Sequence, residues 1–393
     1  MKKNNVLPGI AKRKEPVLYG LMLTGLYLLL LFTNQAAAQS CSDTAADSRT
    51  NIFFKRLLQL QEHHTVFGHQ DALAYGVGWK GISGNSDVKA VAGDYPGLYG
   101  WDIGHLEMQK EANLDNVSFR DMKKYIREGF ERGGIITISW HLRNPLTGGS
   151  AWDTAKGTVA SVLPGGNRHE IFKKWLDQVA GFMHDLKDKY GKPIPVLFRP
   201  FHELTGNWFW WCKNVCTPDE FKALWRFTVS YLREQKKVHH LLYVYNTAGF
   251  ASESDFMASY PGDDMVDVVS FDQYQHKTGT NADRQGFIDE MERKLTILCQ
   301  VASRRKKIAA LAETGLEAVP DRQWWTAALW PVIKDFSLAY VLVWRNHGYM
   351  PSIRRMHYYA PYPGQQSAQD FRKMTKYPRM LLEKGVRKIN VYQ

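Results

Sequence analysis

The sequence predicts a (β/α)8 TIM barrel, an α/β fold, in which residues 39–393 form a single domain behind a signal peptide at 1–38. Eight short apolar runs rich in β-branched residues recur along the chain, and helical patterns separate most of them. Nearly continuous apolar strands are typical of a parallel sheet covered on both faces. The main alternative is an open doubly wound sheet, which is disfavoured because no Gly-rich phosphate loop follows the first run.

The first 38 residues have the layout of a secretory signal peptide. Five basic residues precede an apolar run at 16–32, and three alanines at 36–38 favour cleavage before Gln39. The run is at the short end for a membrane span, so we expect export to the periplasm or the exterior with no permanent span. Cys41 leaves a lipoprotein anchor open as an alternative, but the two residues before it match a lipid-attachment motif poorly.

The elements expected beyond residue 40 follow one another without a linker or an internal repeat, which indicates one domain. The expected strands are 65–68, 97–103, 135–140, 194–198, 241–245, 266–271, 308–312 and 339–344. The clearest helical patterns are 119–132, 170–190, 218–235, 283–304, 321–336 and 369–384. Thr217 before Pro218 is a typical helix start.

The composition excludes a disordered, collagen-like or coiled-coil chain, because 44% of the residues are hydrophobic and 13 are Trp. The net charge is +12; removing the five basic residues and one acidic residue of 1–38 leaves +8. This charge is dispersed and no nucleic-acid motif accompanies it, so we expect no nucleic-acid partner. We expect the protein to be a monomer.

Two carboxylates end apolar runs at the carboxyl edge of the expected barrel, where TIM barrels carry their chemistry. Glu203 follows the fourth strand and Glu313 follows the seventh. A single glutamate at a strand end is often only a helix cap or an ion-pair partner of a residue such as Arg199. A pair of carboxylates is what glycoside hydrolysis needs, and the aromatic residues nearby suit the apolar faces of sugar rings.

Histidine and cysteine patterns add two expectations. The histidines at the strand ends, among them His69, lack a helical metal-binding spacing, so we expect neither a metal nor another cofactor. Cys212 and Cys216 lie four residues apart after the aromatic run 208–211, and in an oxidising compartment we expect them to form a disulfide.

Four segments together resemble glycoside hydrolase family 26: RPFHE at 199–203, WFWW at 208–211, SFDQY at 270–274 and AETG at 312–315. The resemblance covers most of the chain after the signal peptide. It implies a TIM-barrel hydrolase that retains anomeric configuration, and most members of the family are β-mannanases. The implied substrate is therefore a β-mannan or a manno-oligosaccharide.

The resemblance also implies roles for individual residues. Glu203 corresponds to the acid/base and Glu313 to the nucleophile. The implied substrate-binding residues are His141, His202, Trp208, Asp272, Tyr274, Trp344 and Arg345. Trp152 joins them as an expected contact because it lies on the long loop 142–168, which could partly close the cleft.

The resemblance leaves the mode of attack open. We expect internal cleavage of β-1,4-mannan with mannobiose as a major product, and the alternatives are release of mannobiose from chain ends or the same chemistry on another β-glycan. A catalytically silent glycan-binding protein is the non-enzymatic alternative. It is disfavoured because both glutamates are present.

Overall fold

The computed structural model describes residues 40–278 and 280–393. The predicted signal peptide at 1–38 lies outside the described residues. Within them, no helix is both long and apolar enough to cross a membrane.

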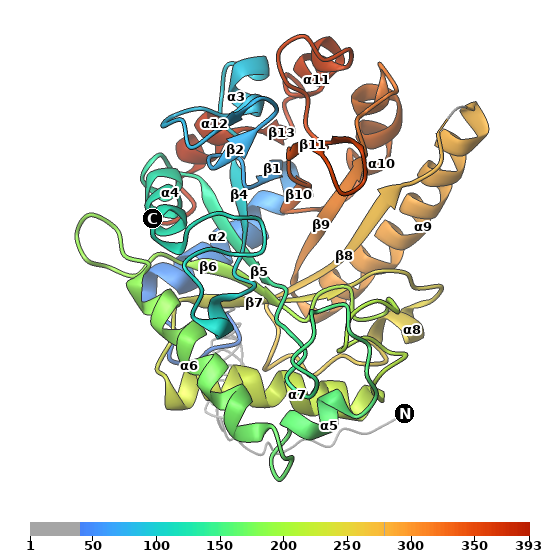
Figure 1. Ribbon diagram of the computed structural model, residues 1–393. Coiled ribbons are helices and arrows are strands. Elements are labelled where there is room, and N and C mark those ends of the chain that lie inside the picture. Colours follow the sequence, from blue (N-terminus) through green and yellow to red (C-terminus); the bar gives the residue numbers. More distant parts are fainter. Residues whose placement is uncertain (1–39, 279) are drawn as a thin grey trace, which may run out of the picture. The chain divides into compact units, whose positions relative to one another are not determined.

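Eight parallel strands form a closed barrel, which confirms the predicted TIM-barrel fold (Figure 1). Each strand pairs with the next one along the chain, and β10 returns to β1 so that Phe67 lies opposite Val341. A short strand, β13 (Met380–Leu381), pairs with the outer side of β1. The barrel strands are β1 (Thr65–Gln70), β4 (Leu98–Asp102), β5 (Ile135–Trp140), β6 (Val196–Pro200), β7 (Leu241–Thr247), β8 (Val268–Gln275), β9 (Ile308–Leu316) and β10 (Tyr340–Val343).

Helices surround the barrel, and their first turns follow the expected capping chemistry (Figure 1). Thr217 and Glu220 form a reciprocal capping box at the start of α7, with Pro218 as the first helical residue. The larger helices are α4 (Phe119–Glu131), α6 (His169–Asp185), α7 (Pro218–Ser230), which continues as a π-helical turn (Tyr231–Gln235), and α9 (Asn281–Arg305).

Two of the helix predictions differ in kind from the structure, and the helix predicted at 170–190 ends early, at Asp185. The segment predicted as one helix at 369–384 is instead α11 (Ala368–Met374), β13 and α12 (Glu383–Ile389). Pro378 explains the break, because proline lacks an N–H and disfavours helical geometry at the residue before it. The segment 321–336 holds a π-helical turn (Trp325–Leu329) followed by a short helix, α10 (Trp330–Ile333).

The floor of the barrel is closed by α2 (Ser48–His63), a helix that the sequence patterns did not single out. Its side chains Phe53, Phe54 and Leu57 are almost completely buried and join the apolar residues that fill the barrel interior. Phe53 also stacks on Tyr392 near the carboxyl terminus, with ring centroids 4.8 Å apart. The amino-terminal end of the barrel is therefore an apolar plug, and the polar residues collect at the opposite end.

Short elements decorate that opposite end, in the loops after the barrel strands. Two hairpins, β2–β3 and β11–β12, are antiparallel. These small elements are β2 (Tyr75–Gly76), β3 (Trp79–Lys80), α3 (Asp87–Ala92), a 3-10 turn (Leu106–Met108), α5 (Thr158–Val162), α8 (Glu253–Met257), β11 (Gly348–Met350) and β12 (Arg355–His357).

Candidate active site

Glu203 sits on a strained turn directly after β6. Phe201 and Glu203 both adopt left-handed backbone conformations, with φ of 52° and 54°, which are costly for residues other than glycine. The turn is held by Asn246 of β7, whose Oδ1 accepts a hydrogen bond from the Glu203 N–H at 2.7 Å. The strain is thus maintained by a neighbouring strand, which fixes the direction of the Glu203 side chain.

Glu313 lies on β9 and is buried beside a hydroxyl donor and a guanidinium. Tyr274 on β8 donates its hydroxyl to Glu313 Oε2 at 2.7 Å, and the Arg199 guanidinium pairs with Oε1. Arg199 also pairs with Asp272 at 2.8 Å. Because Arg199 stands between two carboxylates, each of them has a positive partner in a site that excludes water.

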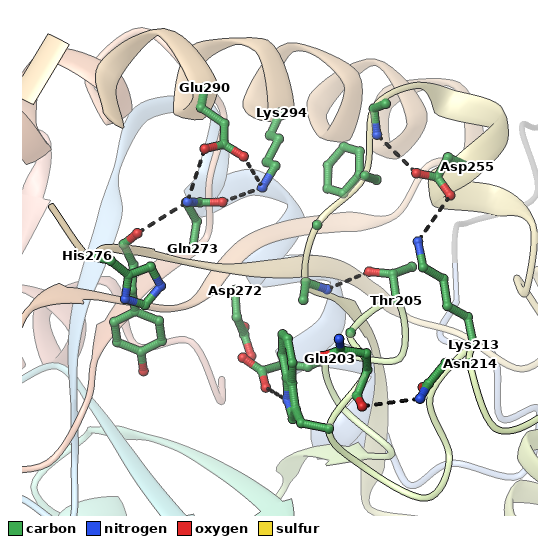
Figure 2. Close-up of a pocket in the computed structure, with 18 residues that line it drawn as sticks. Glu203, Thr205, Lys213, Asn214, Asp255, Asp272, Gln273, His276, Glu290 and Lys294 are labelled. Carbon is green, nitrogen blue, oxygen red and sulfur yellow. Dashed lines mark hydrogen bonds and ion pairs between the residues drawn. The ribbon is translucent and has the colours of Figure 1, made fainter. Parts of the chain in front are cut away.

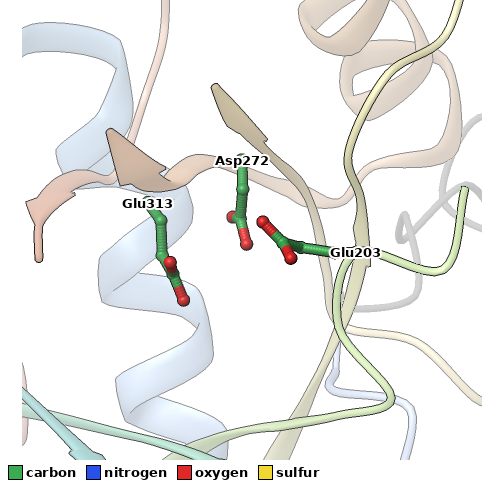
Figure 3. Close-up of side chains that lie close together, drawn as sticks. All are labelled: Glu203, Asp272 and Glu313. Atoms are coloured by element: carbon green, nitrogen blue, oxygen red, sulfur yellow. The ribbon is translucent and has the colours of Figure 1, made fainter. Parts of the chain in front are cut away.

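The carboxyl groups of Glu203, Asp272 and Glu313 lie close together (Figure 3). One carboxylate oxygen from each of Glu203, Asp272 and Glu313 lies within 4.8 Å of the others. Inverting glycosidases separate their carboxyl groups by about 6.5–9.5 Å to admit a water, whereas retaining enzymes hold them about 5–5.5 Å apart. The spacing therefore fits a double displacement.

The same three carboxylates form a group close enough to bind a metal ion. Two of the three, Asp272 and Glu313, are already paired with Arg199. The guanidinium thus supplies the positive charge that a cation would bring. The donor set is better explained by ion pairing than by metal coordination.

The electrostatic surroundings of Glu203 differ from those of Glu313. Burial and the negative charge of Glu313 raise the pKa of Glu203 to about 7. Trp208 opposes this rise, because its indole N–H donates to Glu203 Oε2 at 2.7 Å. Glu203 can therefore carry a proton near neutral pH, which suits a general acid.

A chain of hydrogen bonds runs behind the glutamates through two histidines. Asp102 on β4 accepts from His141 Nδ1 at 2.8 Å, and the Nε2 atoms of His141 and His202 lie 3.1 Å apart. Burial disfavours a charged His141, but the Asp102 carboxylate outweighs burial and raises the pKa of His141. Burial, followed by the positive charges of His141 and Arg199, lowers the pKa of His202 well below its usual value. The proton between the two rings therefore resides on His141, and His202 accepts the hydrogen bond.

The remaining predicted binding residues are Trp152, Trp344 and Arg345. His141 stacks on Trp152 with ring centroids 5.3 Å apart and meets the edge of Trp344 at 6.3 Å. Arg345, next in the chain, forms an ion pair with buried Asp115. The structure thus brings every predicted site residue to one end of the barrel.

The aromatic run 208–211 has a single member that is open to solvent. Trp208 is 38% exposed, whereas Phe209, Trp210 and Trp211 are buried. Trp211 donates its indole N–H to the carbonyl of His202 at 2.7 Å, so the buried part of the run supports the turn that carries Glu203. Trp208 is left free to form a wall of the cleft.

The predicted disulfide between Cys212 and Cys216 is not formed in the structure, where both cysteines are buried free thiols. Cys212 Sγ donates to the carbonyl of Glu203 at 3.4 Å, and Cys216 Sγ donates to that of Trp211 at 3.5 Å. Each thiol therefore bonds to a backbone carbonyl and not to the other sulfur. The Cys216 N–H also donates to the Cys212 carbonyl at 3.2 Å. Hydrogen bonds therefore replace the expected covalent link.

Sequence reasoning missed three side chains that organise the site. Asn246 holds the Glu203 backbone, Asp115 pairs with Arg345, and Asp102 orients His141. Asn246 and Asp102 stand at strand ends, and that position is the signal that could have identified them. Asp115 lies in the loop after β4, where no pattern marks it.

Comparison with known proteins agrees with this geometry. The model of the family described as glycosyl hydrolase family 26 matches residues 42–318. The chain belongs to glycosyl hydrolase family 26. The resemblance drawn from the sequence motifs is therefore confirmed.

Individual relatives extend the similarity along most of the barrel. A family 26 β-mannanase structure from Bacteroides ovatus shares 44% identity and a TM-score of 0.83, covering 88% of this chain and 97% of that one. The catalytic domain of a Bacillus sp. JAMB-750 endo-β-1,4-mannanase shares 31% identity and a TM-score of 0.81, covering 90% and 96%.

Curated relatives are longer than the part that they share with this chain. A mannan endo-1,4-β-mannosidase from Bifidobacterium adolescentis is 32% identical over 326 residues, which are 78% of this chain and 32% of the relative. One with the same name from Bacillus subtilis strain 168 is 30% identical over 203 residues, covering 48% and 52%. The chain thus spans about a third to a half of these relatives.

Proposed function

We propose that this family 26 member hydrolyses β-1,4-mannosidic bonds in mannans, retaining the configuration at the anomeric carbon. The observation that best supports this proposal is that Glu203 and Glu313 lie close together and that the pKa of Glu203 is raised. Both solved relatives described above are named as mannanases, and so are the curated ones. These names support mannan as the substrate.

In the first step, Glu313 attacks the anomeric carbon while Glu203 gives its proton to the leaving oxygen. Arg199 and Tyr274 bond to the Glu313 carboxylate and hold it in position until the bond forms. The resulting glycosyl ester has no charge on Glu313, so the repulsion that raises the pKa of Glu203 disappears. Glu203 then accepts a proton from the water that releases the sugar.

On the glycone side, Arg345 and Trp344 would bind the sugars that remain on the enzyme through the intermediate. The ion pair with Asp115 restrains the Arg345 guanidinium, so its donors are fixed before substrate arrives. Productive binding would then favour substrates that fill two glycone positions, and mannobiose would be a major product.

Trp152 bears on the mode of attack. It is 50% exposed on the loop 142–168 and is stacked against His141, so it covers part of the glycone side. We propose internal cleavage as the main mode. Stepwise release of mannobiose from chain ends is the alternative if this loop closes the cleft beyond the second sugar.

The proposal is tested by incubating the purified protein separately with linear mannan, lichenan and β-1,3-xylan. We expect hydrolysis of mannan, mannobiose among the major products and, by proton NMR, initial release of the β-anomer. Early appearance of mixed longer oligosaccharides would identify internal cleavage. Hydrolysis of lichenan or xylan in place of mannan would contradict the substrate, and inactivity on all three would favour a binding protein.

We also propose export with cleavage before Gln39 and no lipid on Cys41. Cys41 is 3% exposed and its thiol donates to the Asp43 carbonyl at 3.4 Å. A diacylglycerol group on that sulfur would have to displace the floor of the barrel. Mass spectrometry of the exported protein tests this: an amino terminus at Gln39 is expected, and a lipidated Cys41 would contradict the proposal.

A further inference from the structure

A second side of the cleft holds residues to which neither the motifs nor the relatives assign a role. It is a cavity of about 580 Å³ that opens beside the acid/base (Figure 2). Its wall includes Glu203, Trp208, Gln273, Glu290 and Lys294. The described residues proposed for the glycone side, His141, Trp152, Trp344 and Arg345, do not line it.

The position of Glu203 identifies what this cavity receives. A general acid must reach the oxygen of the leaving group, so the space next to it on the side away from the glycone residues is where the leaving sugars lie. Trp208, 38% exposed and bonded to Glu203, forms one wall. The end of β8 and the helix α9 form the facing wall.

Three side chains on that facing wall form a closed polar ring. The ammonium of Lys294 pairs with Glu290 Oε1 at 2.9 Å and also donates to Gln273 Oε1, while Gln273 Nε2 lies 3.5 Å from Glu290 Oε2. Lysine can only donate, so the Gln273 atom facing it must be the amide oxygen. The amide N–H₂ is therefore directed at Glu290 and at the carbonyl of Tyr274, 3.2 Å away.

This ring differs from an ordinary helix-surface ion pair. Pairs at i and i+4 are usually solvent-exposed and contribute a few tenths of a kcal/mol. The Lys294 side chain is only 2% exposed, and burying an ammonium is expensive unless its partners are held in place. Glu290 is 46% exposed, so its carboxylate keeps acceptor positions open to the cavity while Lys294 holds it from behind.

We propose that Gln273 and Glu290, positioned by Lys294, bind hydroxyl groups of the leaving-group mannosyl units opposite Trp208. An aromatic face on one wall and fixed polar groups on the other match the apolar face and hydroxyl-bearing edges of a sugar. This inference rests on the proposed mannanase function. It adds leaving-group specificity to a cleft whose assigned binding residues, apart from Trp208, belong to the glycone side or the catalytic centre.

The test compares two substrates in a double variant, Glu290→Gln with Lys294→Met, which removes both charges without leaving one buried and unpaired. Mannopentaose fills leaving-group positions with sugars, whereas 4-nitrophenyl β-mannobioside places only an aryl group there. We expect the ratio of kcat/KM on mannopentaose to that on the aryl substrate to fall roughly tenfold, since hydrogen bonds to a charged group are lost. Gln273→Ala should lower the same ratio.

The matched control is Glu128→Gln with Lys124→Met, an i,i+4 pair at 3.9 Å on α4 outside this cavity. It should leave the ratio unchanged. An equal fall in kcat/KM on both substrates in the Glu290/Lys294 variant would show a merely structural role. Unchanged kcat/KM on both substrates would show that these residues do not bind the leaving group. Either result overturns the inference. Wild-type inactivity on both substrates would instead overturn the proposed function on which it rests.

Discussion

The two ends of the barrel interior are built from opposite chemistry on the same strands. At the floor, side chains such as Leu98, Ile135 and Leu242 pack against α2, and the interior is apolar. At the mouth, Arg199 and Asp272 are buried polar residues on different strands, and each has the other as a partner. Apolar packing requires a close fit but no specific charged partner, whereas buried charges require partner geometry that a single substitution can break. The floor thus provides stability, and the mouth provides reactivity.

Glu313→Ala is the largest expected perturbation of the mouth. Loss of the nucleophile should reduce turnover of mannan and of aryl β-mannobioside on the order of 10⁴-fold or more. The free energy of unfolding should also fall, because buried Arg199 loses one of its two partners, but Asp272 remains to pair with it. Rates on both substrates and the melting temperature check this, and near-wild-type activity on mannan would show the assignment of Glu313 to be wrong.

Glu203→Ala should separate the two substrates. Mannan, with a poor leaving group, should lose most of its hydrolysis, whereas the first step on an activated aryl glycoside needs little protonation and should survive. The glycosyl-enzyme would then accumulate, and azide should restore turnover by attacking it. Stopped-flow release of the aryl group, with and without azide, measures both steps. Equal losses on mannan and the aryl substrate, with no rescue, would contradict the acid/base role.

Leu57→Ala tests the floor. The side chain is fully buried in α2, and its truncation should lower the free energy of unfolding by about 2–5 kcal/mol while leaving kcat on mannan near the wild-type value. Ile52→Ala on the same helix is the control, because Ile52 is 36% exposed and its loss should cost about 0.5 kcal/mol or less. Urea unfolding gives both values. A large fall in kcat below the melting temperature would show that floor and mouth are coupled.

Arg345→Ala should weaken the glycone side by roughly 2–4 kcal/mol in kcat/KM on mannotetraose, mainly through KM and also through kcat if the remote contact is used in the transition state. Arg345→Lys is the informative companion, because it keeps the charge beside Asp115 but loses the planar pair of donors. Its defect should be intermediate. An unchanged kcat/KM in Arg345→Ala would remove the proposed role.

The smallest expected effect concerns pH. The pKa of Glu203 is raised to about 7, so kcat/KM on mannan should fall as the pH rises above about 7 and the acid loses its proton. Trp208→Phe removes an indole N–H that stabilises the ionised carboxylate, so the pKa of Glu203 should rise and the alkaline limb should move up by about one pH unit. An alkaline limb that does not move would show that it is not controlled by this hydrogen bond.

Much of the fold was predictable because strand periodicity is a local property. All eight barrel strands overlap the apolar runs that predicted them; Glu203 lies on the turn after β6, and Glu313 lies within β9, which continues past the predicted end at 312. The failures have local causes too. Pro378 interrupts the last predicted helix, and α2 passed unnoticed because its apolar face gains meaning only against the barrel floor.

By itself, the sequence determined the positions of the strands, the family and the residues at the barrel mouth, since each of these depends on patterns contained in short segments. Only the tertiary structure decided how the charges are shared. Arg199 bridges two carboxylates, Asp115 restrains Arg345, and Lys294 holds Glu290 at the leaving-group cavity. The physical reason is that the cost of a buried charge depends on partners within a few ångströms, and those partners come from strands and loops far apart in the chain.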